Sequence, residues 1–252
     1  MSLARRTMLR VLASLLACVA MVAGSLGSGA EAAGRGYALR TSTLGDGSTV
    51  TLRWNGCQVI TYMVNLAAVP ASRQATFVRE TRQAVAVVAA ATGFTFAYRG
   101  LTRAMPRTTT GITLPADIVI AYAAPRLTDL PLSGATLGWG GSISYSWKVA
   151  AAGSGYSYGA AAVRGYVVLD TPQVLAMSPG FGPGYRRGNL LLHELGHVMG
   201  LGHVSDRRLL MFDTISASTP NGFAAGDRDG LARLGRTAGC IVVPASIAPA
   251  LS

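Results

Sequence analysis

The chain has 252 residues, of which 50% are hydrophobic and 13% are charged, with 22 Lys and Arg against 11 Asp and Glu. This composition excludes a disordered polyelectrolyte, and the length is sufficient for one large domain with its own buried core. The formal charge of +11 would suit a nucleic-acid-binding protein. However, the basic residues are almost all Arg, with Lys148 as the single Lys, and they are spread along the chain. We therefore expect no nucleic-acid partner.

Residues 1–32 have the pattern of a secretory signal peptide. An arginine-rich start precedes an apolar run from Val11 to Gly24, and Ala30-Glu31-Ala32 then provides a small-residue cleavage site before Ala33. The apolar run is short for a membrane span, and no later stretch is a convincing one. The mature protein is thus expected to be secreted and extracellular, either free or associated with the cell wall.

Removal of this segment changes the charge and the cysteine count. It takes away three Arg and one Glu, which leaves 19 basic and 10 acidic residues and a net charge of +9. Two cysteines remain, Cys57 and Cys240. In an exported protein such a pair can form a disulfide, and two buried free thiols are the alternative.

The mature chain shows no internal repeat and no linker, so we expect one domain at residues 50–252, behind a flexible Gly/Ser/Thr-rich lead at residues 33–49. The predicted elements are a strand at 57–65, a helix after Pro70 that Ser72 caps and Gly93 stops, strands at 94–98 and 117–122, loops and hairpins at 134–159, a strand at 165–170 and a helix at 189–199. This order predicts an α/β sandwich with helices on a mixed sheet.

All three histidines lie in one window, His193-Glu194-Leu195-Gly196-His197-Val198-Met199-Gly200-Leu201-Gly202-His203. On a helix, His193 and His197 project from the same face and can bind one zinc ion. Gly200 can end the helix in a left-handed conformation, so that His203 returns as the third ligand. Three protein ligands leave one position open for water, which is the arrangement of a catalytic zinc site.

Glu194 lies beside the metal-binding face of this helix, where it can hold a water molecule without binding the ion. We therefore predict that Glu194 is the general base that acts on a zinc-activated water. Glu194 and Glu80 are the only glutamates after residue 32, so few groups could replace it. By chance, the full HExxHxxGxxH pattern should occur in only about one in a hundred thousand chains of this length.

The motif and its surroundings resemble the metzincin zinc peptidases, and within them the matrixins, the family of the matrix metalloproteinase catalytic domain and its bacterial secreted forms. Met211 follows His203 by eight positions, the spacing of the matrixin Met-turn, and Asp227 stands where matrixins carry Asp. The resemblance spans about residues 50–238. It implies a metzincin-like zincin domain, with a twisted mixed β-sheet, long helices and a smaller C-terminal subdomain after the zinc helix.

The same resemblance implies a zinc metalloendopeptidase that acts on a protein or peptide substrate, and we expect a monomer. Gly138-Trp139-Gly140-Gly141 stands where matrixins have the bulged edge strand that lines the cleft, although these could be simple hairpin glycines. Met211 could also be ordinary core packing. Asp206, three residues after His203, and Asp227 could support the site or be only a turn residue and a helix cap, so both readings of each remain open.

Two departures from the family and two competing functions complete the prediction. The chain has no cysteine-switch segment between residues 33 and 56, and no further histidine for a second zinc, so only a Ca²⁺ site of Asp and backbone oxygens could be added.

One competing function is a non-catalytic, zinc-folded basic binding module of the cell envelope, and another is a zinc hydrolase of a non-peptide amide. The intact Glu194 and the open fourth position count against the binding module.

Overall fold

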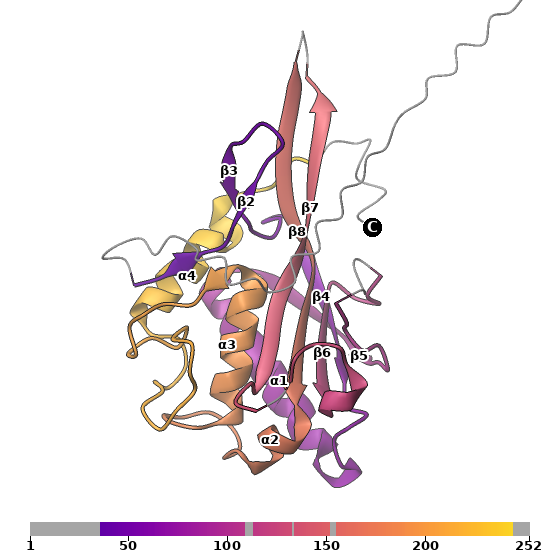
Figure 1. The fold of residues 1–252 in the computed structure, drawn as a ribbon, viewed down its shortest axis with the longest axis vertical. Coiled ribbons are helices and arrows are strands. Elements are labelled where there is room, and N and C mark those ends of the chain that lie inside the picture. The colour runs from indigo at the N-terminus through magenta and orange to yellow at the C-terminus, as the bar shows by residue number, and fades with distance from the viewer. Residues whose placement is uncertain (1–35, 109–112, 133, 152–154, 244–252) are drawn as a thin grey trace, which may run out of the picture.

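A computed structural model describes residues 36–108, 113–132, 134–151 and 155–243. The predicted signal peptide, residues 1–32, lies outside these ranges. The helices cover one face of a twisted five-stranded sheet (Figure 1). This is the predicted mixed α/β architecture of a zincin domain. Within the described residues, no helix is both long and apolar enough to cross a membrane.

The strands of the main sheet follow the order β5-β4-β6-β8-β7. β4 (Val59–Asn65), β5 (Thr95–Leu101), β6 (Ile118–Ala123) and β8 (Tyr156–Asp170) are parallel to one another, whereas β7 (Gly138–Ala150) pairs antiparallel with β8 and forms one edge. β6 is buried at every position, because it lies in the middle of the sheet with side chains packed on both faces. The four predicted strands are confirmed with shifted ends.

The region predicted as loops and hairpins, 134–159, is more regular than expected. β7 pairs with β8 along almost its whole length, and the second half of β7 and the first half of β8 form a long hairpin that extends beyond the helices (Figure 1). The register shifts between Ile143 and Ser144, which marks a bulge. β8 therefore begins well before the predicted start at 165. Gly and Ser weaken the strand pattern of this region, but continuous backbone pairing between the two strands compensates for it.

The long first helix confirms the prediction at its end but not at its cap. α1 (Ala71–Thr92) follows Pro70, and no side chain caps it, so Ser72 lies in the first turn instead. Gly93 ends the helix in the left-handed conformation, with φ of 72°. The remaining helices are α2 (Thr171–Ala176), α3 (Arg187–Met199), α4 (Ala225–Leu234) and the short 3₁₀ helices η1 (Pro125–Leu127) and η2 (Arg236–Ala238).

The segment expected as a flexible lead packs onto the domain from residue 36 onward. β1 (Ala38–Leu39) pairs with β9 (Leu201–Gly202), and β2 (Thr41–Thr43) pairs with β3 (Thr49–Thr51). Tyr37 and Ala38 are buried. The sequence of this segment has little apolar patterning, and its pairing partner β9 is distant in the chain, so no local pattern could have predicted this contact.

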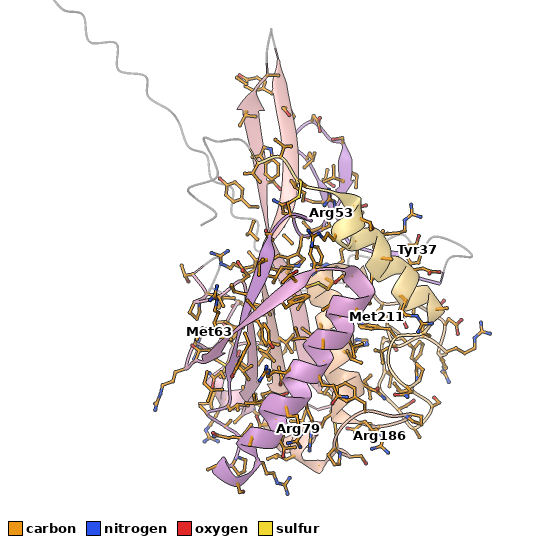
Figure 2. All side chains as sticks on the ribbon, turned by 180° about the vertical axis from the view of Figure 1, so that it is seen from behind. Tyr37, Arg53, Met63, Arg79, Arg186 and Met211 are labelled. Atoms are coloured by element: carbon orange, nitrogen blue, oxygen red, sulfur yellow. A yellow bond between two sulfur atoms is a disulfide. The ribbon has the colours of Figure 1, made fainter. Side chains whose placement is uncertain are left out.

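The main core lies between the sheet and the helices. Trp54 is fully buried there, and its indole Nε1 donates a hydrogen bond to the carbonyl of Val198 at 2.8 Å, which ties the chain before β4 to α3. In Figure 2, Met63 on β4 and Met211, which follows α3, lie on opposite sides of the sheet. The segment after α3, which contains β9 and α4, is the smaller C-terminal part expected from the resemblance.

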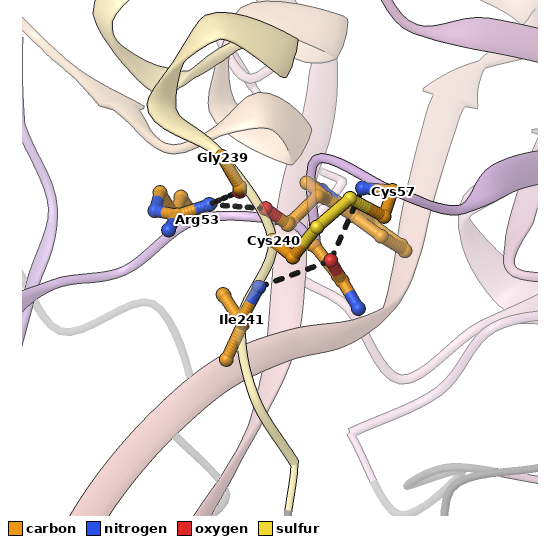
Figure 3. Close-up of a disulfide and its surroundings, with 7 residues drawn as sticks. Arg53, Cys57, Gly239, Cys240 and Ile241 are labelled. Atoms are coloured by element: carbon orange, nitrogen blue, oxygen red, sulfur yellow. Dashed lines mark hydrogen bonds between the residues drawn. A yellow bond between two sulfur atoms is a disulfide. The ribbon is translucent and has the colours of Figure 1, made fainter.

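A disulfide joins Cys57 to Cys240 across a sequence separation of 183 residues (Figure 3). Hydrogen bonds surround it: Arg53 Nη1 donates to the carbonyl of Gly239 at 2.7 Å, and Ile241 N donates to Asn55 Oδ1 at 3.1 Å. The predicted pairing is therefore confirmed over the free-thiol alternative. The bond attaches the chain after α4 to the start of the sheet.

Replacement of both cysteines, C57S/C240S, should lower the free energy of unfolding by about 2–5 kcal/mol, because the disulfide restricts a long loop of the unfolded chain. Urea unfolding of the two proteins, each with and without reductant, measures the difference. Reductant should shift the midpoint of the wild-type protein only. An unchanged midpoint in the reduced wild-type protein would contradict a stabilising disulfide.

Candidate metal centre

The helix α3 places two of the three predicted metal ligands on one face. His193 and His197 are four residues apart, one helical turn, and their Nε2 atoms lie 3.1 Å from each other. His193 is 4% exposed, so its ring is removed from water except at the site. α3 is buried along nearly its whole length, between the sheet and the C-terminal part of the chain, which fixes the position of both rings.

The chain turns back immediately after α3. Gly200 adopts the left-handed conformation, with φ of 111°, and its N–H is bonded to the carbonyl of His197. His203 then lies with its Nε2 atom 3.2 Å from that of His193 and 3.0 Å from that of His197. The three histidines predicted from the motif thus converge at one point, as the structure brings them within 4.8 Å of one another.

Backbone carbonyls orient two of the rings. The Nδ1 atom of His193 lies 2.8 Å from the carbonyl oxygen of Leu210, and that of His197 lies 2.8 Å from the carbonyl oxygen of Leu201. A carbonyl can only accept, so in each case Nδ1 carries the proton. The Nε2 lone pairs are therefore left to point into the site. These two carbonyls could not be identified from the motif, because their positions depend on the path of the chain after α3.

Burial also keeps the imidazoles neutral. Desolvation lowers the pKa of His193 to about 4, although the hydrogen bond to Leu210 raises it in part. Desolvation likewise lowers the pKa of His197 and that of His203. Metal ions bind the neutral imidazole, so the site is prepared for a cation at neutral pH.

The donor set fits zinc. The three Nε2 atoms lie 3.0–3.2 Å from one another, so their lone pairs repel unless a cation lies between them. Zn–N distances of 2.0–2.1 Å in tetrahedral geometry correspond to ligand separations of about 3.3 Å, close to those observed. Three imidazoles suit zinc and leave a fourth position for water.

Glu194 lies next to this cluster but faces the edge strand β7. Its side chain is in contact range of the Gly138 position, where an added Cβ would lie 2.9 Å from Oε1. Gly140 approaches the Glu194 backbone so closely that any side chain there would overlap it. Burial raises the pKa of Glu194 to about 8, and a hydrogen bond from the Gly140 N–H opposes part of this shift. The glycines predicted to belong to the edge strand therefore allow it to pack directly on α3.

Met211 lies beneath the zinc helix, in agreement with the Met-turn spacing. It is 1% exposed, and its Sδ atom would lie 2.5 Å from a Cβ added to Gly196. Gly196, which stands between the two histidines of α3, is thus small because Met211 occupies the adjacent space. Met211 is part of the core as well, so both readings of this residue describe it.

Asp227 fixes the turn at Met211 through hydrogen bonds to its backbone. Its carboxylate accepts hydrogen bonds from the N–H groups of Leu210 at 2.8 Å, Met211 at 3.2 Å and Ala224 at 2.9 Å. The same side chain therefore caps α4 and fixes the carbonyl of Leu210, which orients His193. Burial nevertheless raises the pKa of Asp227, and its three hydrogen bonds oppose this rise. The structural and supporting roles considered for Asp227 are both present.

Asp206 takes no part in the site. Its carboxylate pairs with Arg208, at 2.7 Å between Oδ2 and Nη2, and also accepts from the Arg208 backbone N–H. These hydrogen bonds lower the pKa of Asp206 to about 2. Of the two roles considered for Asp206, the structure therefore shows the turn residue and not a support of the metal site.

The structure also reveals a buried ion pair that the sequence did not suggest. Glu80 on α1 accepts two hydrogen bonds of 3.0 Å from Arg187, the first residue of α3, and one of 2.9 Å from the N–H of Gly180. Arg187 also lies over the ring of Phe77, 4.6 Å from its centroid. The pair fixes the start of the zinc helix against α1. No motif links residues 107 positions apart, so only the fold could show it.

Replacement of Asp227 by Ala should leave the buried N–H groups of Leu210 and Met211 without an acceptor, at a cost of about 1–3 kcal/mol for each, and also the part-buried N–H of Ala224. We expect a lower unfolding midpoint together with weaker zinc binding, measured by denaturation and by competition with a chelator. Asp229→Ala, which removes an exposed carboxylate from the same helix, is the control and should change neither quantity. Equal stability of the two variants would contradict the supporting role of Asp227.

Comparison with known families agrees with this geometry. Residues 147–234, about a third of the chain, match the Peptidase_M10 family model, described as Matrixin. No curated protein matches the chain. The matched segment contains the last four residues of β7, followed by β8, α3, the three histidines, the turn at Met211 and α4. The matched segment is thus similar to a matrixin, and together with the sheet order and the three-histidine centre it supports a matrixin-like zinc metallopeptidase.

Proposed function

We propose that the protein is a secreted zinc endopeptidase in which His193, His197 and His203 bind the metal and Glu194 is the general base. The observation that carries the proposal is the convergence of three Nε2 atoms within 3.2 Å, beside a carboxylate that is only 5% exposed. A zinc site that served only to stabilise the fold would have no use for a buried, protonatable carboxylate next to an open metal position.

The edge strand β7 provides the substrate-binding surface. Among the residues that the structure describes, β7 pairs with β8 on one side and has no strand on the other. An extended peptide can add to such an edge through backbone hydrogen bonds. β7 continues from Gly138, beside Glu194, to Ala150, so the edge extends far beyond the metal centre. This favours cleavage within a chain over removal of a terminal residue.

The chemistry divides between the metal and Glu194. Zinc, when bound, lowers the pKa of a water molecule and polarises the peptide carbonyl. The Glu194 carboxylate accepts a proton from the attacking water at an Oε atom and then passes it to the nitrogen of the leaving amine. Burial makes this carboxylate a stronger base than it would be in water, and the Gly140 N–H holds it in place against β7.

Replacement of Glu194 by Gln should lower kcat/KM for an unstructured protein such as casein by about 10²–10⁴-fold, because the proton acceptor is lost. Zinc content, measured by elemental analysis, should remain at one ion per chain, since Glu194 is not a ligand. Asp229→Asn makes the same carboxylate-to-amide change, but at an exposed position of α4. It serves as the control and should retain full activity. Casein cleavage at the wild-type rate by the Glu194→Gln variant would rule out this mechanism.

Export is supported by the signal-peptide pattern of residues 1–32 and is compatible with the disulfide between Cys57 and Cys240. Expression of the full chain in a bacterial host should yield a protein in the medium or cell envelope that begins at Ala33. N-terminal sequencing of that protein checks the site. A protein that keeps residues 1–32 and stays in the cytoplasm would contradict the proposed export.

A further inference from the structure

Arg40 is anchored beside the metal centre. Its backbone N–H donates to the carbonyl of Gly200 at 2.8 Å, and its own carbonyl accepts from the N–H of Leu52 at 2.9 Å. Gly200 is the turn between His197 and His203, so the position of Arg40 is tied to the loop that closes the site. The preceding residue, Leu39, pairs with Leu201 between β1 and β9.

The Arg40 side chain reaches the edge strand. Its Nη1 atom lies 3.6 Å from the point that a Cβ on Gly141 would occupy, and the Tyr166 hydroxyl oxygen lies 3.3 Å from the same point. Gly141 follows Gly140, the residue that contacts Glu194. Two hydrogen-bond donors thus lie together at the edge of β7, one residue along the strand from Gly140 and on the opposite face of the strand from Glu194, because successive strand residues point to opposite faces.

The guanidinium of Arg40 has no acidic partner within the described part of the chain. Three other arginines form ion pairs there, Arg164 with Asp117, Arg187 with Glu80 and Arg208 with Asp206. Arg40 is partly buried, and burial lowers its pKa, although the nearby Tyr166 opposes the shift. A cation that has lost water without gaining an anion is destabilised, and a carboxylate from a ligand would relieve this cost.

Resting on the proposed function, we propose that Arg40 and Tyr166 form a carboxylate-binding subsite at the edge of β7, which selects substrates with an Asp or Glu side chain close to the scissile bond. β7 runs from Gly138, at Glu194, past Gly141 toward Ala150. In a peptide that pairs antiparallel to β7, the residues beside Gly141 precede the scissile bond. The selected acidic residue therefore lies on the amino-terminal side of the cleaved bond.

The test uses fluorogenic peptides that differ only by Glu or Gln at successive positions before the cleaved bond. At one position, the wild-type protein should cleave the Glu peptide with a kcat/KM about tenfold or more above that of the Gln peptide, as expected for a charge-assisted hydrogen bond. Arg40→Gln should bring this ratio to about one, and Tyr166→Phe should lower it in part. Arg40→Glu should reverse the preference, toward a Lys peptide over the Gln peptide.

The ratio of two peptides in one variant does not depend on the fraction of active protein, so partial misfolding cannot mimic the result. Arg79→Gln, which removes an exposed charge from α1, should leave the ratio at the wild-type value. Cleavage of both peptides with no Glu preference, or an unchanged preference in Arg40→Gln, would overturn the subsite and leave the peptidase function intact. Failure of the zinc-loaded wild-type protein to cleave any peptide would instead overturn the function, and the subsite with it.

Discussion

The zinc centre requires three imidazole nitrogens to stay within 3.2 Å of one another with their lone pairs facing inward. In the absence of a cation this arrangement is unfavourable, so the surrounding structure must hold each ring. The helical repeat aligns two of the rings, and the left-handed turn at Gly200 returns the third. The carbonyls of Leu210 and Leu201 fix the tautomers of His193 and His197. Asp227 in turn fixes the backbone of Leu210, so a carboxylate on α4 contributes to the geometry of a ring on α3.

The position of α3 is constrained on several sides by contacts of different kinds. At its start, Arg187 forms a buried pair with Glu80 of α1, and the loss of either partner of such a pair is strongly destabilising. Near its end, Trp54 donates to the carbonyl of Val198. Below it, Met211 fills the space that Gly196 leaves free. The helix that bears the ligands is therefore among the most constrained elements, which is consistent with the need for preorganised ligands.

Glycines on the edge strand β7 determine how closely this strand packs against Glu194. A Cβ at Gly138 or Gly140 would overlap Glu194, so glycine at these two positions allows β7 to lie directly against the base. This contact removes the carboxylate from water and raises its pKa. The same strand remains free along its outer edge within the described residues. One element thus both tunes the proposed base and offers the proposed binding edge, which couples substrate position to the catalytic group.

The sequence alone determined the parts that depend on local spacing. The four-residue separation of His193 and His197, the stop at Gly200 and the apolar run of β6 each follow from the geometry of a helix, a turn or a strand, and the structure confirms them. Other features depend on residues that are distant in the chain. The packing of β1 on β9, the pair of Glu80 with Arg187, and the approach of Arg40 to Gly141 each join segments that no periodic pattern connects. Only the tertiary structure decided these contacts, because burial and charge pairing depend on which surfaces meet in space.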